Sequence, residues 1–170
     1  NKVSPKSVVD LPCGTGKLSK LLSSRNIDVT AGDISEQMLH FAKLRYERLG
    51  YDKAKFIVCD AEKLSEQISA PVDLAICLRL LHRVPSDIKA NILEDFAKVA
   101  PYSIVSTGVE TTFHKARRKV RKAIIGGGNS YFYETQAEFE AIVSKHHEIV
   151  SKKWILPNLS QEIIYLLRSK

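Results

Sequence analysis

The chain has 170 residues, of which 44% are hydrophobic and 26% charged, as in an ordinary soluble globular domain. No apolar run reaches the roughly 20 residues that a membrane-spanning helix needs, which excludes a spanning segment of that kind. Lysines and arginines number 26 against 19 acidic residues, and the resulting net charge of +7 favours an anionic partner such as nucleic acid, membrane or an acidic substrate.

The chain begins at Asn1, without an initiator methionine or a signal-like stretch, only a few residues before the first predicted strand. We therefore expect a single domain over residues 1–170 that lacks its natural N-terminal segment. The three cysteines, Cys13, Cys59 and Cys77, are widely spaced and show no metal-like pairing. This usage indicates free thiols and a cytoplasmic protein.

Apolar runs typical of strands alternate with amphipathic segments typical of helices over the first two thirds of the chain. The strand-like runs are near-continuous rather than alternating, which is typical of parallel strands buried on both faces. The alternation predicts an α/β fold with a doubly wound sheet and right-handed crossovers. The predicted strands are 7–11, 28–33, 54–60, 72–79 and 102–109, and the predicted helices are 16–24, 35–50 and 85–99.

The last third of the chain follows a different pattern. Residues 110–134 contain a basic helical stretch followed by the glycine-rich "GGGNS". Thr135 and Glu138 fit a capping box and predict a helix that runs to about Lys145. The segments "EIVSKKWILP" and "QEIIYLLRS" are predicted to be strands joined by a turn at Pro157–Ser160, so they should be antiparallel neighbours.

The turn "VVDLPCGTG" after the first predicted strand suggests a ligand site. In open α/β sheets, ligands bind outside the carboxyl ends of the strands. Gly14 and Gly16 would let backbone N–H groups face a ligand, and a helix starting near Gly16 would add a partial positive charge. A dinucleotide fingerprint would need a third glycine at Ser19, and a P-loop would need Ser or Thr where Leu18 stands. Both patterns are therefore disfavoured.

Three carboxylates are predicted at the same edge of the sheet. Asp10 lies in the first strand, Asp33 ends the second and Asp60 ends the third. Asp33 can accept both ribose hydroxyls, while Asp60 and the backbone N–H of Ala61 can read an adenine edge. Asp10 can attract an ammonium group. These groups describe a ligand with an amino-acid end, a ribose and an adenine, and without a pyrophosphate.

Four segments, "VVDLPCGTG", "VTAGDISEQML", "FIVCDAEKL" and "VDLAICLRLLHRV", resemble the four consecutive motifs of class I S-adenosylmethionine-dependent methyltransferases in order and spacing. The resemblance covers about residues 7–169. It implies a Rossmann-like seven-stranded sheet in the order 3-2-1-4-5-7-6, with strand 7 antiparallel. One departure is Pro12, which replaces a glycine common in the first motif and removes a backbone N–H, so a shifted loop is expected.

The resemblance also implies the cofactor and the residues near it. The cofactor would be S-adenosylmethionine, the product S-adenosylhomocysteine, and no metal would be required. Gly14 and Gly16 would approach the methionine part, Asp33 the ribose and Ile34 the adenine. The full set of expected cofactor-binding residues is Asp10, Cys13, Gly14, Thr15, Gly16, Asp33, Ile34, Asp60, Ala61, Cys77 and Leu78.

Several of these residues have a structural alternative. Asp33 and Asp60 would also suit ordinary polar strand ends, and Asp10 would also suit hydrogen bonding to the loop backbone. Cys13 lies near a predicted helix N-terminus, where thiol pKa values fall, but a small packing residue is the preferred interpretation.

The residues after the fourth strand are expected to border the acceptor. Arg79, His82 and Arg83 are the candidate substrate contacts, and His82 is also the candidate general base. A wall-lining role suits His82 equally well, because methyl transfer from a sulfonium often needs only alignment. The pair His146 and His147, near a predicted helix C-terminus, is interpreted as surface structure rather than a metal site.

The basic stretch 113–125, "FHKARRKVRKAII", permits two interpretations. It is either a solvated helix face or an insert that borders the acceptor and attracts an anion. No aromatic-rich stacking platform is interleaved with its charges, which counts against single-stranded nucleic acid. The fourth segment "CLRLLHR" also lacks the Asn/Asp-Pro-Pro-Tyr/Phe form that marks base-amino methylation, and resembles the small-molecule type instead.

The sequence therefore predicts a methyltransferase that acts on a small-molecule, glycan or lipid acceptor of anionic character, with the acceptor itself unidentified. An RNA methyltransferase is the alternative suggested by the charge. A non-catalytic cofactor-binding module of a larger protein is the alternative from another class. A nicotinamide-dependent reductase is a weaker third.

Overall fold

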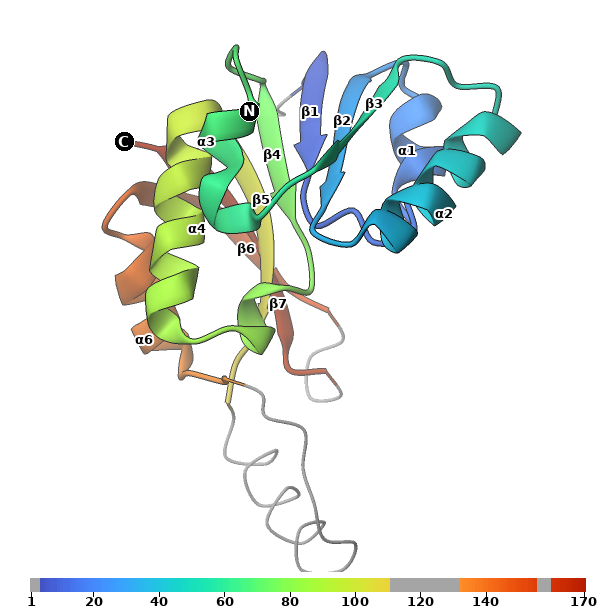
Figure 1. The fold of residues 1–170 in the computed structure, drawn as a ribbon. Coiled ribbons are helices and arrows are strands. Elements are labelled where there is room, and N and C mark those ends of the chain that lie inside the picture. Colours follow the sequence, from blue (N-terminus) through green and yellow to red (C-terminus); the bar gives the residue numbers. More distant parts are fainter. Residues whose placement is uncertain (1–3, 111–131, 156–159) are drawn as a thin grey trace, which may run out of the picture.

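A seven-stranded sheet in the order β3-β2-β1-β4-β5-β7-β6 is the centre of the computed structural model, which describes residues 4–110, 132–155 and 160–170 (Figure 1). The strands are β1 (Ser7–Asp10), β2 (Asp28–Asp33), β3 (Ala54–Val58), β4 (Leu74–Cys77), β5 (Tyr102–Gly108), β6 (His147–Trp154) and β7 (Glu162–Ser169). The helices are α1 (Ser19–Ser23), α2 (Glu36–Arg48), α3 (Leu64–Gln67), α4 (Ser86–Val99) and α6 (Gln136–Val143), with short 3₁₀ turns η1 (Ala61–Lys63) and η2 (Leu81–Arg83).

The strand order and directions predicted from the sequence are confirmed. Strands β1 to β5 pair in parallel, and β7 lies between β5 and β6, antiparallel to both. The predicted terminal hairpin is therefore present as β6 and β7, although residues 156–159 of its turn lie outside the described residues.

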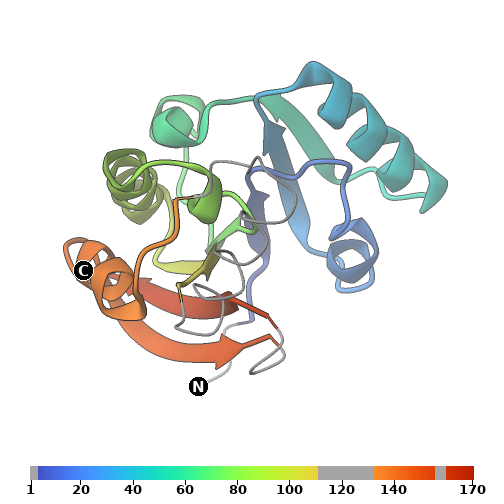
Figure 2. The ribbon, with the colours of Figure 1, turned by 90° about the horizontal axis from the view of Figure 1, so that it is seen from below.

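Helices cover both faces of the sheet, which explains the near-continuous apolar strands. Helices α1 and α2 lie on one face and α3, α4 and α6 on the other, as the view from below shows (Figure 2). Successive strand residues point to opposite faces, so Val8 joins the core under α1 and α2 while Val9 joins the core under α4. In β4, Ile76 and Cys77 divide in the same way.

Two helix starts match their predicted caps. The Ser35 side chain accepts a hydrogen bond from the backbone N–H of Met38 at the start of α2. At the start of α6, the capping box is complete: Thr135 accepts from the Glu138 backbone, and the Glu138 carboxylate accepts from the Thr135 backbone N–H at 2.8 Å. These local bonds satisfy N–H groups that the helix itself leaves without partners.

Some boundaries differ from the prediction. Helix α1 has only five residues and begins at Ser19, because the chain from Gly14 forms turns instead of a helix beginning near Gly16. The η1 and α3 segments were not predicted, since elements of three and four residues are too short to show a 3.6-residue period. The fourth strand ends at Cys77 rather than at residue 79.

The insert between β5 and α6 begins and ends beside the carboxyl end of β5. Val109 and Glu134 form a parallel bridge, and the Glu110 N–H donates to the Glu134 carbonyl at 2.8 Å. The predicted basic helix at 113–125 and the glycine-rich segment lie outside the described residues. Among the residues that the structure does describe, no helix has the length and apolar character that crossing a bilayer requires.

The turn between β1 and α1 gives its two glycines different roles. Both have positive φ, +52° at Gly14 and +71° at Gly16, a conformation that glycine adopts without strain. A side chain at Gly14 would meet nothing within 4 Å, whereas one at Gly16 would lie 3.0 Å from the Cα of Ala42 in α2. Gly16 therefore lets the turn pack against α2, and only Gly14 leaves open space beside the backbone. The Leu11–Pro12 peptide bond before this turn is cis.

His147 is buried, which corrects its interpretation as surface structure. It starts β6 with 1% of its surface exposed, and within the described residues neither ring nitrogen has a hydrogen-bond partner. Burial, with a smaller contribution from His146, lowers the pKa of His147 to about 4. The folded protein therefore keeps this imidazole neutral in mildly acidic solution.

The glycine geometry predicts unequal effects of alanine. Gly14→Ala should lower the free energy of unfolding by about 1 kcal/mol through backbone strain alone. Gly16→Ala adds the contact with Ala42 and should cost about 1 kcal/mol more, as overpacked sites do. Urea denaturation of both variants measures the difference. Equal losses would contradict the packing role of Gly16.

The buried histidine predicts a loss of stability in acid. Below pH 6.5 the unfolded chain binds a proton at His147, while the folded chain does not until about pH 4. Between these values the parent should lose about 1.4 kcal/mol per pH unit relative to His147→Leu. Denaturation curves at several pH values test this, and His146→Leu is the control that should keep most of the dependence.

Candidate active site

The predicted site residues gather at the carboxyl ends of the parallel strands, along the lower edge of the sheet in Figure 1. Asp10 lies opposite Ala31 in the β1–β2 register, and Asp33 lies two residues further along β2. Because strand side chains alternate, Asp10 lies on the same face as Val8, and Asp33 lies on the same face as Ala31. Both faces belong to the α1–α2 side, so the two carboxylates are neighbours.

The Asp33 carboxylate joins the glycine turn to the start of α2. Its Oδ2 accepts from the Gly14 N–H at 2.9 Å, and its Oδ1 accepts from the Ser35 N–H at 3.0 Å. Asp33 is 6% exposed. Each carboxylate oxygen has a second lone pair, so both can still accept a donor from a ligand.

The N–H groups of the two glycines themselves form hydrogen bonds within the chain. The Gly14 N–H donates to Asp33, and the Gly16 N–H donates to the Cys13 carbonyl at 3.0 Å. The turn leaves open space beside Gly14, next to the Asp33 carboxylate that accepts the Gly14 hydrogen bond.

Asp10 is a buried carboxylate without a hydrogen-bond donor among the described residues. It is 3% exposed, and burial together with the charge of Asp33 raises its pKa to about 7. The folded state therefore holds the proton more tightly than the unfolded chain, and stability falls as pH rises from about 4 to 7. A cation bound beside Asp10 would offset this cost, so the site favours a ligand with a positive group.

The end of β3 is tied to the same edge. The Cys59 N–H donates to the Asp33 carbonyl at 3.1 Å, which brings the following Asp60 alongside. Asp60 is exposed, and its Oδ1 accepts from the Glu62 N–H at 3.1 Å as the cap of η1. Ala61 is buried, while Ile34 is 70% exposed.

The cysteines are packing residues in this structure. All three are unpaired and buried. Burial, with the charges of Asp10 and Asp33, raises the pKa of Cys13 to about 12, so this thiol is not ionised at neutral pH. Cys77 has no exposed surface, so the expectation that it lies beneath a ligand is not supported by its position. Thr15 and Leu78 are half-buried at the edge.

Arg79 follows β4 in an unusual conformation. Its φ is +63°, which costs a non-glycine residue about 1 kcal/mol. The Arg79 N–H donates to the Ser106 hydroxyl at 2.9 Å, and that hydroxyl donates to Glu162 Oε1 at 2.7 Å. Ser106 is fully buried in β5 and Glu162 lies in β7, so hydrogen bonds from these two strands hold the backbone of Arg79 in its strained conformation. Strain held in this way is frequent at functional sites.

His82 lies in η2, between the end of β4 and the residues that precede α4. Burial, reinforced by Arg83, lowers the pKa of His82, so its imidazole is neutral at pH 7. Its ring stacks on Tyr133, with centroids 6.1 Å apart and planes inclined by 13°. Arg79 precedes His82 in the chain and Arg83 follows it, and both arginines are exposed. The three residues expected to contact the acceptor thus lie in the same turn after β4.

Sequence reasoning missed Tyr133, Ser106 and Glu162. Tyr133 ends the insert and Glu162 starts β7, so neither is near a recognised motif in the sequence. The sequence did hold one sign of Ser106: it lies inside an apolar predicted strand, and a buried hydroxyl needs a hydrogen-bond partner.

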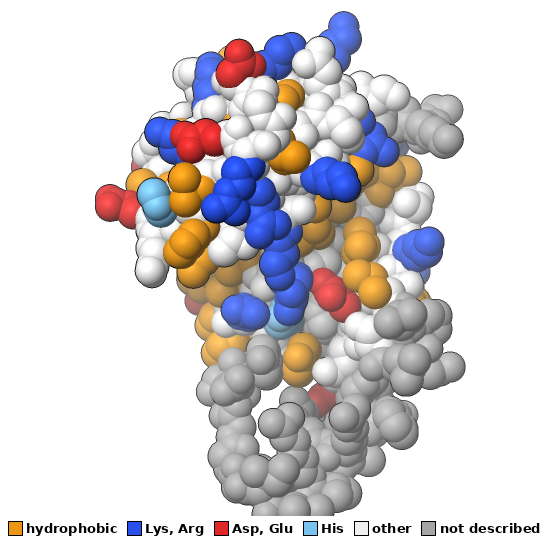
Figure 3. All heavy atoms as spheres, turned by 90° about the vertical axis from the view of Figure 1, so that its right-hand side faces the viewer, with side chains coloured by type: hydrophobic (Ala, Val, Ile, Leu, Met, Phe, Trp, Pro, Cys, Tyr) orange, Lys and Arg blue, Asp and Glu red, His pale blue; other side chains and the backbone are white. Residues whose placement is uncertain are grey.

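The described residues also carry a basic surface and a groove that lie apart from the glycine turn. Lysines and arginines form a band among apolar side chains on the side that carries α1 and α2 (Figure 3). A groove of about 590 Å³ lies at the amino ends of β1 to β3, away from the candidate residues. Within the described residues, no group of three or more His, Cys, Asp or Glu could hold a metal ion.

Known proteins with similar sequences include methyltransferases. Ubiquinone biosynthesis O-methyltransferase of Dechloromonas aromatica is 37% identical over 81 residues, which are 48% of this chain and 34% of that protein. The enzyme of the same name from Idiomarina loihiensis is 32% identical over 121 residues, 71% of this chain and 46% of its own length. The chain thus spans less than half the length of these two relatives.

The fold is shared with solved methyltransferases. Magnesium protoporphyrin IX methyltransferase from Synechocystis PCC 6803, solved with bound S-adenosylhomocysteine, superposes with a TM-score of 0.82 at 21% identity. That match covers 96% of this chain and 74% of the other. A family model described as a methyltransferase domain matches residues 8–101, more than half of the sequence. The chain therefore belongs to the methyltransferase-domain family.

Proposed function

We propose that this protein transfers a methyl group from S-adenosylmethionine to an oxygen atom of a small acceptor. The observation that carries the proposal is the pair of buried carboxylates, Asp10 and Asp33, beside the open backbone of Gly14. One carboxylate lacks a donor among the described residues, and the other keeps lone pairs for a further donor. The similarity to O-methyltransferases supports the oxygen acceptor.

The residues suit the parts of this cofactor in order. Asp10 would meet the ammonium group, which offsets the cost of its burial. Asp33 would accept the ribose hydroxyls, and exposed Ile34 would lie against the adenine. Asp60 and the backbone of Ala61 would read the adenine edge from the end of β3.

When bound, S-adenosylmethionine supplies an activated methyl group and leaves as S-adenosylhomocysteine. The main contribution of the chain would be to align the acceptor with the methyl group. The turn from Arg79 to Arg83, which follows β4, would hold the acceptor. His82, neutral because its pKa is lowered, would take the hydroxyl proton as the oxygen forms its new bond.

The acceptor is proposed to carry negative charge. Arg79 and Arg83 are both exposed at the acceptor turn, where each could pair with a carboxylate or phosphate of the substrate. The stacked rings of His82 and Tyr133 offer a flat surface beside them, which suits a planar acceptor.

The proposal is tested by assaying transfer with S-adenosylmethionine that carries a deuterated methyl group. Caffeic acid and its methyl ester form a matched pair of aromatic hydroxyl acceptors with and without a carboxylate. Mass spectrometry should detect a labelled methyl ether and S-adenosylhomocysteine, with faster formation from the acid. Binding of S-adenosylhomocysteine without transfer to any hydroxyl probe would favour a cofactor-binding module instead, and labelling of RNA alone would favour the nucleic-acid alternative.

The ribose contact predicts a specific loss of cofactor affinity. Asp33→Asn places an amide donor where two backbone N–H groups already donate, and it removes an acceptor for ribose. The dissociation constant of S-adenosylhomocysteine, measured by calorimetry, should rise at least about tenfold, the effect of roughly one lost hydrogen bond to a charged group. NADH titrated into the parent is the control, and tight NADH binding would contradict the proposed cofactor.

The ammonium contact predicts a dependence on pH. Without ligand Asp10 has a pKa of about 7, and a neighbouring ammonium favours its ionised form, so binding releases a proton below pH 7. The dissociation constant of S-adenosylhomocysteine should therefore rise about tenfold between pH 8 and pH 6. Asp10→Asn should bind more weakly and show a flat profile. A flat profile in the parent would remove Asp10 from the site.

A further inference from the structure

Lys89 is a fully buried lysine on the apolar side of α4. It precedes Ile92 and Leu93 by three and four residues, so all three lie on the same helix face. An apolar residue would suit that face, and burying an ammonium group is costly unless it is paired. We therefore looked to the contacts of its amino group for the reason that a lysine occupies this position.

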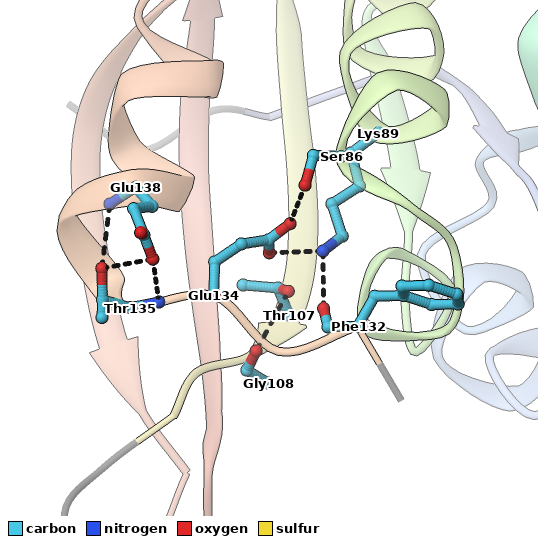
Figure 4. Close-up of polar contacts among 8 residues, drawn as sticks. All are labelled: Ser86, Lys89, Thr107, Gly108, Phe132, Glu134, Thr135 and Glu138. Carbon is cyan, nitrogen blue, oxygen red and sulfur yellow. Dashed lines mark hydrogen bonds and ion pairs between the residues drawn. The ribbon is translucent and has the colours of Figure 1, made fainter. Parts of the chain in front are cut away.

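The amino group of Lys89 joins α4 to the chain that returns from the insert (Figure 4). It donates to the Phe132 carbonyl at 2.7 Å and forms an ion pair with Glu134. The other oxygen of Glu134 accepts from the Ser86 hydroxyl at 2.6 Å, one turn earlier on the helix. The Glu134 side chain is 13% exposed, so both charges of the pair are largely shielded from water.

The segment between these anchors carries Tyr133. On one side of it the Phe132 N–H donates to the His82 carbonyl at 3.1 Å. On the other side Glu134 forms the bridge to Val109. The Tyr133 ring lies directly on the backbone of β5, because a Cβ placed at Gly108 would be 2.4 Å from its Cε1 atom. In this position the ring stacks on His82.

We propose that Lys89 and Glu134 are positioning residues, which hold the 132–134 segment against α4 and thereby stack Tyr133 on His82. The assignment of this stack as the wall of the acceptor site rests on the proposed function. The positional claim itself does not, because it concerns contacts within the folded chain.

A purely stabilising role explains the pair less well. Buried ion pairs are often no more stabilising than apolar residues of similar volume. Removal of one partner leaves an unpaired buried charge and strongly destabilises the fold. A single substitution therefore cannot separate displacement of the 132–134 segment from unfolding of the protein. Replacing both charges together avoids that ambiguity.

The test compares the double variant Lys89→Met/Glu134→Leu with the parent by NMR. The chain has five histidines, so the His82 ring signals are assigned by their disappearance in His82→Gln. In the parent, cross-relaxation between the His82 and Tyr133 rings and an upfield ring-current shift of the His82 protons are expected. In the double variant both signals should be lost, while the protein remains folded.

Two further variants bracket this result. Gly108→Ala keeps the ion pair but occupies the space of the Tyr133 ring, so it should also lose the stacking signals. Lys98→Met is the matched control on the same helix, because Lys98 pairs with Glu94 at 3.1 Å on the exposed surface. It should keep the stacking signals of the parent.

Cofactor binding separates this proposal from the proposed function. The double variant should bind S-adenosylhomocysteine within about twofold of the parent, since Asp10, Gly14 and Asp33 lie elsewhere at the edge. Retention of the His82–Tyr133 signals in the folded double variant would overturn the positioning role. Failure of the double variant to fold would also overturn it, because the pair would then serve stability. Absence of binding in the parent would instead contradict the proposed function.

Discussion

The candidate site depends on the two hydrogen bonds that the Asp33 carboxylate accepts from backbone N–H groups. The two carboxylate oxygens hold the Gly14 turn and the start of α2 in place, so one buried acid fixes the backbone on both sides of the proposed ribose position. Its charge also raises the pKa of Asp10. The protein thus keeps two acidic groups close together at a cost to its own stability, which a ligand with hydroxyl and ammonium groups would offset.

The two halves of the site are built in different ways. The half at β1 to β3 consists of turns that follow directly from their strands, so short stretches of sequence set its geometry. The half at β4 and β5 relies on bonds between distant segments: Ser106 holds the Arg79 backbone, and Lys89 holds the segment that carries Tyr133.

The predictions from sequence succeeded where an apolar run, a helix cap or a short turn marked the element locally. The strands, the helix starts at Ser35 and Thr135, and the terminal hairpin were all recognisable, because local propensity and the fold agreed. They failed where the sequence offers no period or no local partner. Helix α3 is too short for a period, and His147 was placed on the surface because nothing near it in the sequence shows what covers it.

The sequence by itself determined the alternation of strands and helices, the acidic strand ends and, through four motifs, the family. These features are local, since each depends on residues a few positions apart. Only the tertiary structure decided that Gly16 packs on α2 while Gly14 stays open, and that Cys77 is closed off in the core. It also decided that Tyr133 stacks on His82, because that contact is held by a lysine and a glutamate 45 residues apart in the chain. No local pattern in the sequence encodes such a contact, since its residues are far apart in the chain and are neighbours only in the folded structure.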